Sequence, residues 1–579
     1  WFGRVPLVTS ASASGADVDL VIGPLLRYVS ADEATIWVET NGPCTVRVTL
    51  DDGPESSADT WSVHGHHFAI VMIEGLEGGK IYPYRVELDG TECWPVDDGF
   101  PHSVIRPPSR DDRLRVTFGS CRRTAPFDEA NLKELGADAL AALSERMKVT
   151  DATTWPDLLL FVGDQVYADN PSAEMIDKLR QLHPEDDPIG EEVHDFEEYT
   201  WLYAESWSTP EIRWVLSTLP SCMILDDHDL RDDWNSSWDW RNEIVHEPWW
   251  RDRVLGAFGS YWIYQHLGNL SAEELAADEK YLEVIAAPDE ETRNRLVDDF
   301  AWRADDEPSS SRWSYYRDFG RNRLIVIDSR CSRDLDPDRR KMVDEGEWAW
   351  LVDKATHDVD HLLVGTTLPY LLLPGIHDLE GWNEATSEGA WGKLYAKLGE
   401  RLRLALDLEH WAAFRNSFDD LTGLIADRAA SDSPPSSVLV MSGDIHCSYT
   451  AEATLPAVED SVTRVHQLVM SPIRNTLQRS VQLANRFFRT RGAHAVLGFL
   501  ARRSGVEDPA ITWGVNQGLW FTNGLMTVEI DGRSSRVVVE TACVEDGLQR
   551  LVEVGTYVLA DGSAPSEAGN DAGRTELAS

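Results

Sequence analysis

The chain has 579 residues, of which 42% are hydrophobic and 26% are charged. This composition is typical of a globular protein, and a chain of this length predicts at least two domains. No run of about 18 or more apolar residues occurs, so we expect no membrane span. The formal net charge of -46 argues against general nucleic-acid binding, because another polyanion would be repelled. It would also repel phosphate esters unless bound cations supply positive charge at the site; adaptation to solubility or high salt explains the acidity equally well.

The seven cysteines indicate neither a disulfide framework nor a zinc knuckle, since they are few, odd in number and contain no C-x-x-C pair. The chain begins with Trp1 rather than Met, so an export signal could have preceded it. Because no such signal is visible, a cytoplasmic location is favoured. The sequence does not indicate an oligomeric state.

The first predicted domain is a small β-sandwich over residues 20–108, preceded by an N-terminal extension at residues 1–19. Short alternating segments within it, such as residues 35–39 and 82–87, are typical of half-buried strands. The segment at residues 106–112 contains two prolines and several charges, which indicates a linker.

A second domain is predicted over residues 112–560, where strands alternate with helices. Residues 129–147 repeat apolar residues at helical spacing. Five short apolar runs are predicted to be buried strands; they end at Val162, Leu225, Ile327, Val364 and Met441. Such alternation indicates an α/β domain with largely buried sheets.

Three further segments stand out by composition. Residues 234–265 are dense in tryptophan, for which core packing is favoured over a substrate-binding wall. Residues 474–503 combine seven arginines with apolar residues. A helix pair packed on the acidic body explains them most simply, and a helix at a partner or membrane surface is the alternative. The tail at residues 561–579 is rich in Ala, Gly, Ser and Glu, which is typical of disorder.

Polar residues recur just after the predicted strands, where ligands bind in open α/β sheets. The clusters lie at residues 119–123, 163–169, 226–229, 328–330 and 442–446. Each alone has a simpler explanation, such as a turn, a helix cap or a small buried cysteine. Together, however, their acids would repel one another, and a bound multivalent cation would remove that conflict.

Three of these clusters carry a family resemblance. In chain order, Gly163-Asp-Gln-Val-Tyr167, Asp226-Asp-His-Asp229 and Ser442-Gly-Asp-Ile-His446 resemble the metallophosphoesterase superfamily in its alkaline phosphatase D branch, across roughly residues 20–550. The resemblance implies a four-layer αββα sandwich as the catalytic domain, preceded by an immunoglobulin- or fibronectin III-like β-sandwich. It also implies metal-dependent hydrolysis of phosphate esters.

The resemblance assigns individual residues to that reaction. The implied metal ligands are Cys121, Asp164, Tyr167, Asp227, Asp444 and His446. Asp164 would bridge two cations, and His228 keeps the place of the catalytic histidine, which would protonate the leaving group or bind a phosphoryl oxygen. Thr367 stands where the superfamily usually has a further histidine, so a ligand there is in doubt.

Two arginines are predicted to contact the phosphate, since a guanidinium can bind two oxygens at once. They are Arg122 and Arg330, and for each of them an ion pair with nearby acids is an equally good explanation.

The expected cofactors are iron (Fe³⁺) and calcium (Ca²⁺), with other divalent metals as alternatives. Asp227 and Asp444 place carboxylates where the superfamily has neutral ligands, which favours a hard cation such as Ca²⁺. Cys121, Tyr167 and His446 offer a thiolate, a phenolate and an imidazole, and the resemblance implies Fe³⁺ there.

The expected substrate is a small-molecule or lipid phosphate ester, with nucleic acid involved only as a possible phosphodiester substrate. The sequence does not separate monoesters from diesters. The alternatives are a phosphodiesterase specific for lipid headgroups or nucleotides, and a non-catalytic metal-binding interaction protein.

Overall fold

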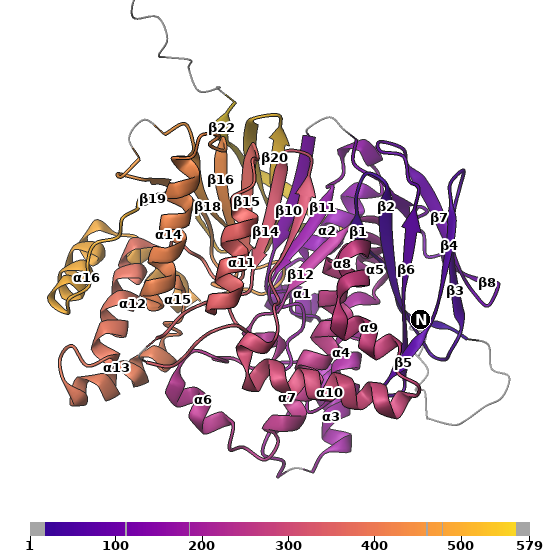
Figure 1. Cartoon of the computed structure of the whole chain (residues 1–579), viewed down its shortest axis with the longest axis horizontal. Coiled ribbons are helices and arrows are strands. Elements are labelled where there is room, and N and C mark those ends of the chain that lie inside the picture. Colours follow the sequence, from indigo (N-terminus) through magenta and orange to yellow (C-terminus); the bar gives the residue numbers. More distant parts are fainter. Residues whose placement is uncertain are drawn as a thin grey trace, which may run out of the picture.

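The computed structural model describes residues 18–109, 113–184, 186–337, 339–458, 461–477 and 479–562. Most of the predicted N-terminal extension and of the predicted disordered tail, and the end of the predicted linker, lie outside these residues. Figure 1 shows a mixed α/β fold in which the N-terminal strands stand beside two larger, adjacent sheets.

The N-terminal strands form two antiparallel sheets with a common core. One sheet has the order β1 (Leu20–Val29), β2 (Glu33–Thr40), β6 (His66–Glu74) and β5 (Trp61–Val63). The other has the order β4 (Glu55–Asp59), β3 (Thr45–Leu50), β7 (Tyr82–Leu88) and β8 (Thr91–Trp94), with β9 (Val104–Ile105) paired to β7. Alternate residues such as Ile36, Val48 and Val86 meet between the sheets, as the alternation in the sequence predicted.

The N-terminal sheets are joined to the rest of the molecule by a buried arginine on β1. Arg27 is fully buried, and its guanidinium donates hydrogen bonds to the carbonyl oxygens of Tyr264 (2.6 Å), Gln265 (2.7 Å) and Ser221 (3.3 Å). Burial lowers the pKa of Arg27 to about 10. These contacts join β1 to strand β12 and to the end of the tryptophan-rich segment.

The two larger sheets carry the predicted buried strands. One has the order β12 (Ser221–Ile224), β11 (Leu158–Val162), β10 (Arg113–Gly119), β20 (Gly524–Asp531), β21 (Ser534–Glu545) and β22 (Leu548–Asp561). The other has the order β13 (Tyr315–Phe319), β14 (Asn322–Ile327), β15 (His361–Thr366), β16 (Ser437–Ser442), β18 (Arg464–Val469), β17 (Ser448–Thr454) and β19 (Thr512–Trp520). Strands β10 to β12 run parallel, as do β14, β15, β16 and β18. Their apolar runs are continuous because both faces of each sheet are covered.

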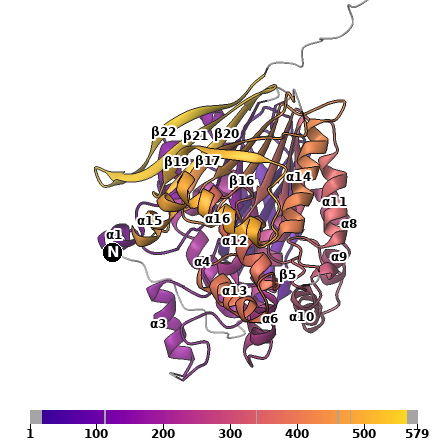
Figure 2. The same cartoon turned by 90° about the vertical axis from the view of Figure 1, so that its left-hand side faces the viewer.

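Helices cover the outer faces of the larger sheets (Figures 1 and 2). The helices of the described residues are α1 (Glu129–Leu135), α2 (Ala139–Met147), α3 (Ala173–Leu182), α4 (Phe196–Trp207), α5 (Pro210–Thr218), α6 (Trp238–Ile244), α7 (Trp250–Ser260), α8 (Ala272–Ala277), α9 (Glu279–Ile285), α10 (Glu290–Asp306), α11 (Glu345–Ala355), α12 (Pro374–Ser387), α13 (Lys393–Ala405), α14 (Arg415–Ala429), α15 (Arg479–Phe488) and α16 (Arg491–Arg503). Leu351 of α11 and Ile425 of α14 pack on Ile325 and Val364 of the second sheet, while Leu160 and Leu363 share the core between the two sheets.

Two sequence predictions can be compared directly with these helices. The apolar repeat at residues 129–147 forms two helices rather than one, because Gly136 adopts a φ of 78° and Asp138 caps a new helix. The tryptophan-rich segment packs in the core as predicted: Trp234, Trp250 and Trp262 are buried, whereas Trp238 is 45% exposed.

Candidate metal centre

The loops after the parallel strands converge on one site, because the carboxyl ends of parallel strands meet at the same edge of a sheet. Cys121 follows β10, Asp164 follows β11, Asp227 follows β12, and Asp444 and His446 follow β16. Four of these residues have a left-handed backbone, with φ values of 58° at Cys121, 53° at Asp164, 66° at Asp444 and 48° at His446. Non-glycine residues adopt this conformation rarely and at a cost of about 1 kcal/mol or more, and such residues gather at functional sites.

The glycines of both Gly-Asp pairs are required by close contacts. A Cβ on Gly163, whose φ is 102°, would lie 2.7 Å from the Cβ of Asp226, and a Cβ on Gly443 would lie 2.0 Å from the Oγ of Ser120. Neither position has room for a larger residue. The two motifs therefore bring the β10, β11, β12 and β16 loops into direct contact.

Three buried aspartates form the acidic part of the site. One carboxylate oxygen each of Asp164, Asp226 and Asp227 lies within 4.8 Å of the others. Among the described residues, Asp164 Oδ1, Asp226 Oδ2 and Asp227 Oδ1 are buried without a hydrogen-bond partner, although Asp227 Oδ1 lies 3.3 Å from Arg330 Nη2. Burial is the main cause that raises the pKa of Asp164 and of Asp227 well above the usual value. Arg330 pairs with Asp226 and Asp227 and offsets only part of this buried negative charge. Buried carboxylates are unfavourable unless cations neutralise them, so this cluster fits a metal ion.

A thiol, a phenol and an imidazole approach the same place. The hydroxyl of Ser471 donates to Cys121 Sγ (3.1 Å), and the Tyr167 hydroxyl donates to Asp164 Oδ2 (3.3 Å). The side-chain amide of Asn475 lies 3.3 Å from the Tyr167 hydroxyl and 3.4 Å from His446 Nε2. Asn475 follows β18 and belongs to no motif in the sequence, so sequence reasoning missed it.

The ionisation of these donors depends on burial. Burial, followed by the charge of Asp164, raises the pKa of the Cys121 thiol and of the Tyr167 phenol. Burial also lowers the pKa of His446 to about 4, which leaves the imidazole neutral with a free lone pair. Metal binding deprotonates thiols and phenols and takes up neutral imidazole, so the donor set suits a cation.

Asp444 is kept ionised by two cationic side chains. His410 Nε2 lies 3.5 Å from Asp444 Oδ2, and Arg330 Nη2 lies 3.9 Å from Asp444 Oδ1. Although burial opposes ionisation, these neighbours lower the pKa of Asp444 to about 2. His410 is itself paired with Glu380 at 2.6 Å, and despite its burial its pKa is raised to about 10. No sequence motif pointed to His410 or Glu380.

His228 is held by a carboxylate that sequence reasoning gave no role. Its Nδ1 lies 2.8 and 3.0 Å from the two carboxylate oxygens of Asp169, and its ring lies against Tyr167 with centroids 4.6 Å apart. Burial favours the neutral ring, but Asp169 outweighs it and raises the pKa of His228 well above the usual value. Since Nδ1 is occupied by Asp169, Nε2 is the nitrogen available to a ligand.

Asp229 supports the two acidic loops by accepting hydrogen bonds from their backbone. Its Oδ2 accepts hydrogen bonds from the backbone N–H groups of Asp164 and Asp226, both at 3.0 Å. Burial raises the pKa of Asp229 to about 7. Asp229 therefore joins the loop after β11 to the loop after β12.

The two predicted phosphate contacts lie in different places. Arg330 is fully buried within the acidic cluster, where it pairs with Asp226, with Glu409 (2.6 Å) and with Asp227 (3.3 Å). It neutralises part of the acidic charge there.

Arg122 points away from the cluster, because its guanidinium donates to Asp138 (2.9 Å) and to the carbonyl of Ser206 (3.0 Å). The structure thus places both arginines in the ion pairs that were the alternative explanation, and it does not bring Arg122 to the other candidate residues.

Thr367, where the superfamily's histidine was missing, is buried. Its hydroxyl shares a hydrogen bond of 2.8 Å with Ser329, and its carbonyl accepts from Gly443 N–H at 2.9 Å. The backbone of Thr367 therefore supports the Gly443 loop, while its side chain is bound to Ser329.

A second group of possible ligands lies between α3 and α4. His183, His194 and Glu198 offer atoms within 4.8 Å of one another. The two imidazole rings, however, are stacked 3.6 Å apart and nearly parallel, at 7°. An imidazole lone pair lies in its ring plane, and parallel planes do not meet at one ion. We therefore describe this group as an ion-pair network.

Comparisons with known proteins agree with this architecture. A solved structure described as the structure of PhoD matches with a TM-score of 0.60 and 11% identity, covering 96% of this chain and 95% of that chain; at this identity the likeness concerns the fold. A type III pullulan hydrolase from Thermococcus kodakarensis covers 94% of this chain and 100% of its own, but its TM-score of 0.14 at 10% identity carries no argument. No curated protein matches the sequence.

Family models cover both parts of the chain. Residues 17–105 match a domain of unknown function (DUF7800). Among the described residues, no helix is long and apolar enough to cross a membrane. Residues 144–497, more than half of the chain, match the PhoD-like phosphatase model. The chain therefore belongs to the PhoD-like phosphatases, a family of metal-dependent phosphoesterases.

Proposed function

We propose that this phosphatase hydrolyses phosphate esters at a centre of two or more cations. The proposed ligands are Cys121, Asp164, Tyr167, Asp227, Asp444 and His446. The observation that carries the proposal is the cluster of buried carboxylates of Asp164, Asp226 and Asp227, each of which has one oxygen without a hydrogen-bond partner. Asp226 joins this set although the family motif did not assign it, and its pairing with Arg330 suits a supporting role.

The residues around the cations divide the chemistry between them. Bound cations would activate a water molecule and offset negative charge on the phosphoryl oxygens. His228, held at Nδ1 by Asp169, presents its Nε2 proton to the leaving-group oxygen. Arg330 and His410 keep Asp444 ionised, so that this carboxylate remains able to bind a cation.

We propose Fe³⁺ and Ca²⁺ as the cations. Cys121, Tyr167 and His446 offer a thiolate, a phenolate and an imidazole, which suit Fe³⁺. The carboxylates of Asp227 and Asp444 are hard oxygen donors, which suit Ca²⁺. Other divalent metals are the alternative.

The finer architecture is part of the proposal. We assign residues 20–108 to an immunoglobulin- or fibronectin III-like sandwich and residues 112–560 to a four-layer αββα catalytic domain. The shared core of the two larger sheets, with helices on the outer faces, supports the second assignment. The double-sheet N-terminal core supports the first.

The test combines metal analysis of the purified protein with a panel of phosphate monoesters and diesters. We expect metal in stoichiometric amounts and turnover that Asp164→Asn removes. Stoichiometric metal without turnover on any ester would instead support a non-catalytic binding protein. Turnover confined to lipid-headgroup or nucleotide diesters would identify the more specific phosphodiesterase.

A further inference from the structure

The helix pair α15 and α16 lies at one end of the molecule, beside α12 (Figures 1 and 2). Its closest contacts with α12 involve small groups and backbone. A Cβ on Gly375 of α12 would lie 2.5 Å from the carbonyl oxygen of Phe488, and a Cβ on Gly498 of α16 would lie 3.2 Å from Asp378 Oδ2. The pair therefore approaches α12 closely through small groups and backbone.

Helix α15 turns an apolar side to the solvent, which is the reverse of a normal amphipathic surface helix. An amphipathic helix usually turns its apolar side to the core and its polar side to water. In α15 the side chain of Asn485 is buried, whereas Leu483 is 64% and Phe487 is 58% exposed. Leu483 and Phe487 lie four residues apart, on the same side of the helix. A continuous apolar strip of α15 therefore faces outward.

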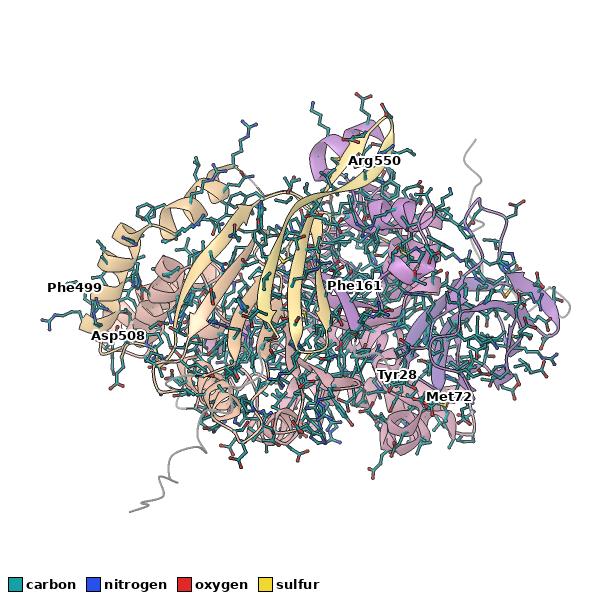
Figure 3. The ribbon with its side chains drawn as sticks, turned by 90° about the horizontal axis from the view of Figure 1, so that it is seen from above. Tyr28, Met72, Phe161, Phe499, Asp508 and Arg550 are labelled. Carbon is teal, nitrogen blue, oxygen red and sulfur yellow. The ribbon has the colours of Figure 1, made fainter. Side chains whose placement is uncertain are left out.

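Helix α16 also exposes large apolar residues while it buries small ones. Its buried residues are small, namely Ala493, Gly498 and Ala501, while Val496 and Phe499 are 63% and 62% exposed. Figure 3 shows Phe499 at the outer margin of the molecule. Val496 and Phe499 are three residues apart, so they also share one side. Both helices thus turn Leu483, Phe487, Val496 and Phe499 away from the protein, whereas Phe488, Leu497 and Leu500 are half-buried.

The charge of this helix pair is opposite to that of the rest of the chain. Residues 479–503 contain six arginines and no Asp or Glu, in a chain whose net charge is -46. Arg479, Arg491 and Arg503 make no ion pair within the described part of the chain. Arg502 pairs with Asp508 at 3.0 Å, and Arg489 donates to the carbonyl of Gly518 at 2.6 Å. A basic apolar surface on an acidic protein points to an acidic, partly apolar counterpart.

The helix pair follows a residue of the metal centre closely in the sequence. Asn475, which contacts Tyr167 and His446, precedes the first residue of α15 by four positions. Four residues span at most about 14 Å. The first turn of α15 therefore begins close to the proposed phosphoesterase site.

We propose that α15 and α16 form a docking surface for an anionic phospholipid membrane, and that the substrates are phosphate esters presented at that surface. Leu483, Phe487, Val496 and Phe499 would enter the acyl boundary while the arginines contact lipid phosphates, as in other interfacial helices. A second copy using the same surface would bring like-charged arginines together, which disfavours a symmetric dimer. The substrate part of the inference rests on the proposed function, whereas the docking part does not.

The test measures sedimentation with vesicles of phosphatidylcholine alone and of phosphatidylcholine mixed with phosphatidylglycerol. We expect the protein to bind only the mixed vesicles and to dissociate at high salt. The variant Leu483→Asp/Phe487→Asp should lower the partition coefficient at least about tenfold. Arg486→Gln and Arg491→Gln should each lower it about fivefold.

The matched control places the same charges on other exposed apolar residues. Val149 and Leu282 are 82% and 41% exposed, and Val149→Asp/Leu282→Asp should bind vesicles like the wild type. Equal binding by the α15 variant and the wild type would overturn the proposal. So would a wild type that ignores vesicles but forms a dimer, or binds an acidic protein, through Leu483 and Phe487.

Turnover of soluble 4-nitrophenyl phosphate separates the two proposals. The Leu483→Asp/Phe487→Asp variant should keep this turnover and lose hydrolysis of vesicle-borne phosphate esters. A wild type without any turnover would contradict the proposed function, while vesicle sedimentation would still decide the docking surface. Equal hydrolysis of vesicle-borne esters by variant and wild type would refute the substrate assignment.

Discussion

The contact between His228 and Asp169 makes a specific prediction about pH dependence. Asp169→Asn removes a buried carboxylate that lies 2.8 Å from His228 Nδ1 but keeps the size of the side chain. Since Asp169 stabilises the protonated imidazole, its loss lowers the pKa of His228. If the protonated form donates the leaving-group proton, activity is lost as pH rises through that pKa. The falling limb of the pH–rate profile should therefore move to lower pH in the variant.

The expected shift follows from the strength of the contact. Hydrogen bonds to charged groups contribute about 1.5–3 kcal/mol, and about 1.36 kcal/mol corresponds to one pKa unit. The limb should thus move by about one to two units. The side chain of His228 is 23% exposed, which favours the lower end of this range.

The assay is kcat/KM against pH, measured with an alkyl phosphate and with 4-nitrophenyl phosphate. The alkyl ester should show the larger loss, because its leaving group needs the proton more. Asp232→Asn is a matched control: this carboxyl lies near His228, but Asp232 contacts Asp169 through its backbone N–H, which the substitution keeps. Asp232→Asn should shift the falling limb of the pH–rate profile less than Asp169→Asn does. An unmoved limb in Asp169→Asn, or equal losses for both esters, would refute the role of the pair.

Three further predictions concern the centre itself. Asp164→Asn should lower turnover by several orders of magnitude with little change in circular dichroism, and near-normal activity would remove Asp164 from the site. His228→Ala should retain its metal, as measured by elemental analysis, and lose about 10²–10⁴-fold in rate, with a smaller loss for good leaving groups. The purified protein should be coloured by charge transfer from its thiolate and phenolate ligands to iron, and a calcium chelator should inactivate it reversibly. A colourless, fully active protein containing only zinc would contradict the iron–calcium assignment.

The sequence alone predicted the parts of this protein that local patterns determine. Continuous apolar runs identified the buried strands, because a strand covered on both faces needs apolar residues throughout. The polar residues after those strands predicted one common crevice, because parallel strands end at a common edge, and the family resemblance implied ligand roles for Asp164, Asp227 and Asp444 within it. The motif order was also enough to predict the phosphatase family.

The tertiary structure decided the residues that no local pattern marks. Asn475 and His410 reach the site from loops outside the predicted clusters, and nothing in their immediate sequence shows which side chains they will meet. Asp169 belongs to the cluster at residues 163–169, but only the fold shows that it pairs with His228. Arg122 and Arg330 were alike in sequence, each following a strand. Only the fold separates them, since one faces Asp138 and the other lies among the acids of the centre.

The orientation of α15 and α16 is a similar case. The sequence shows that Leu483 and Phe487 share one side of a helix, but the side that meets the body depends on what α12 offers. Gly375 allows the backbone of α15 to approach closely, and the small residues of α16 fit against the same helix. Periodicity determines which residues share a face; packing against distant elements determines whether that face is buried or exposed.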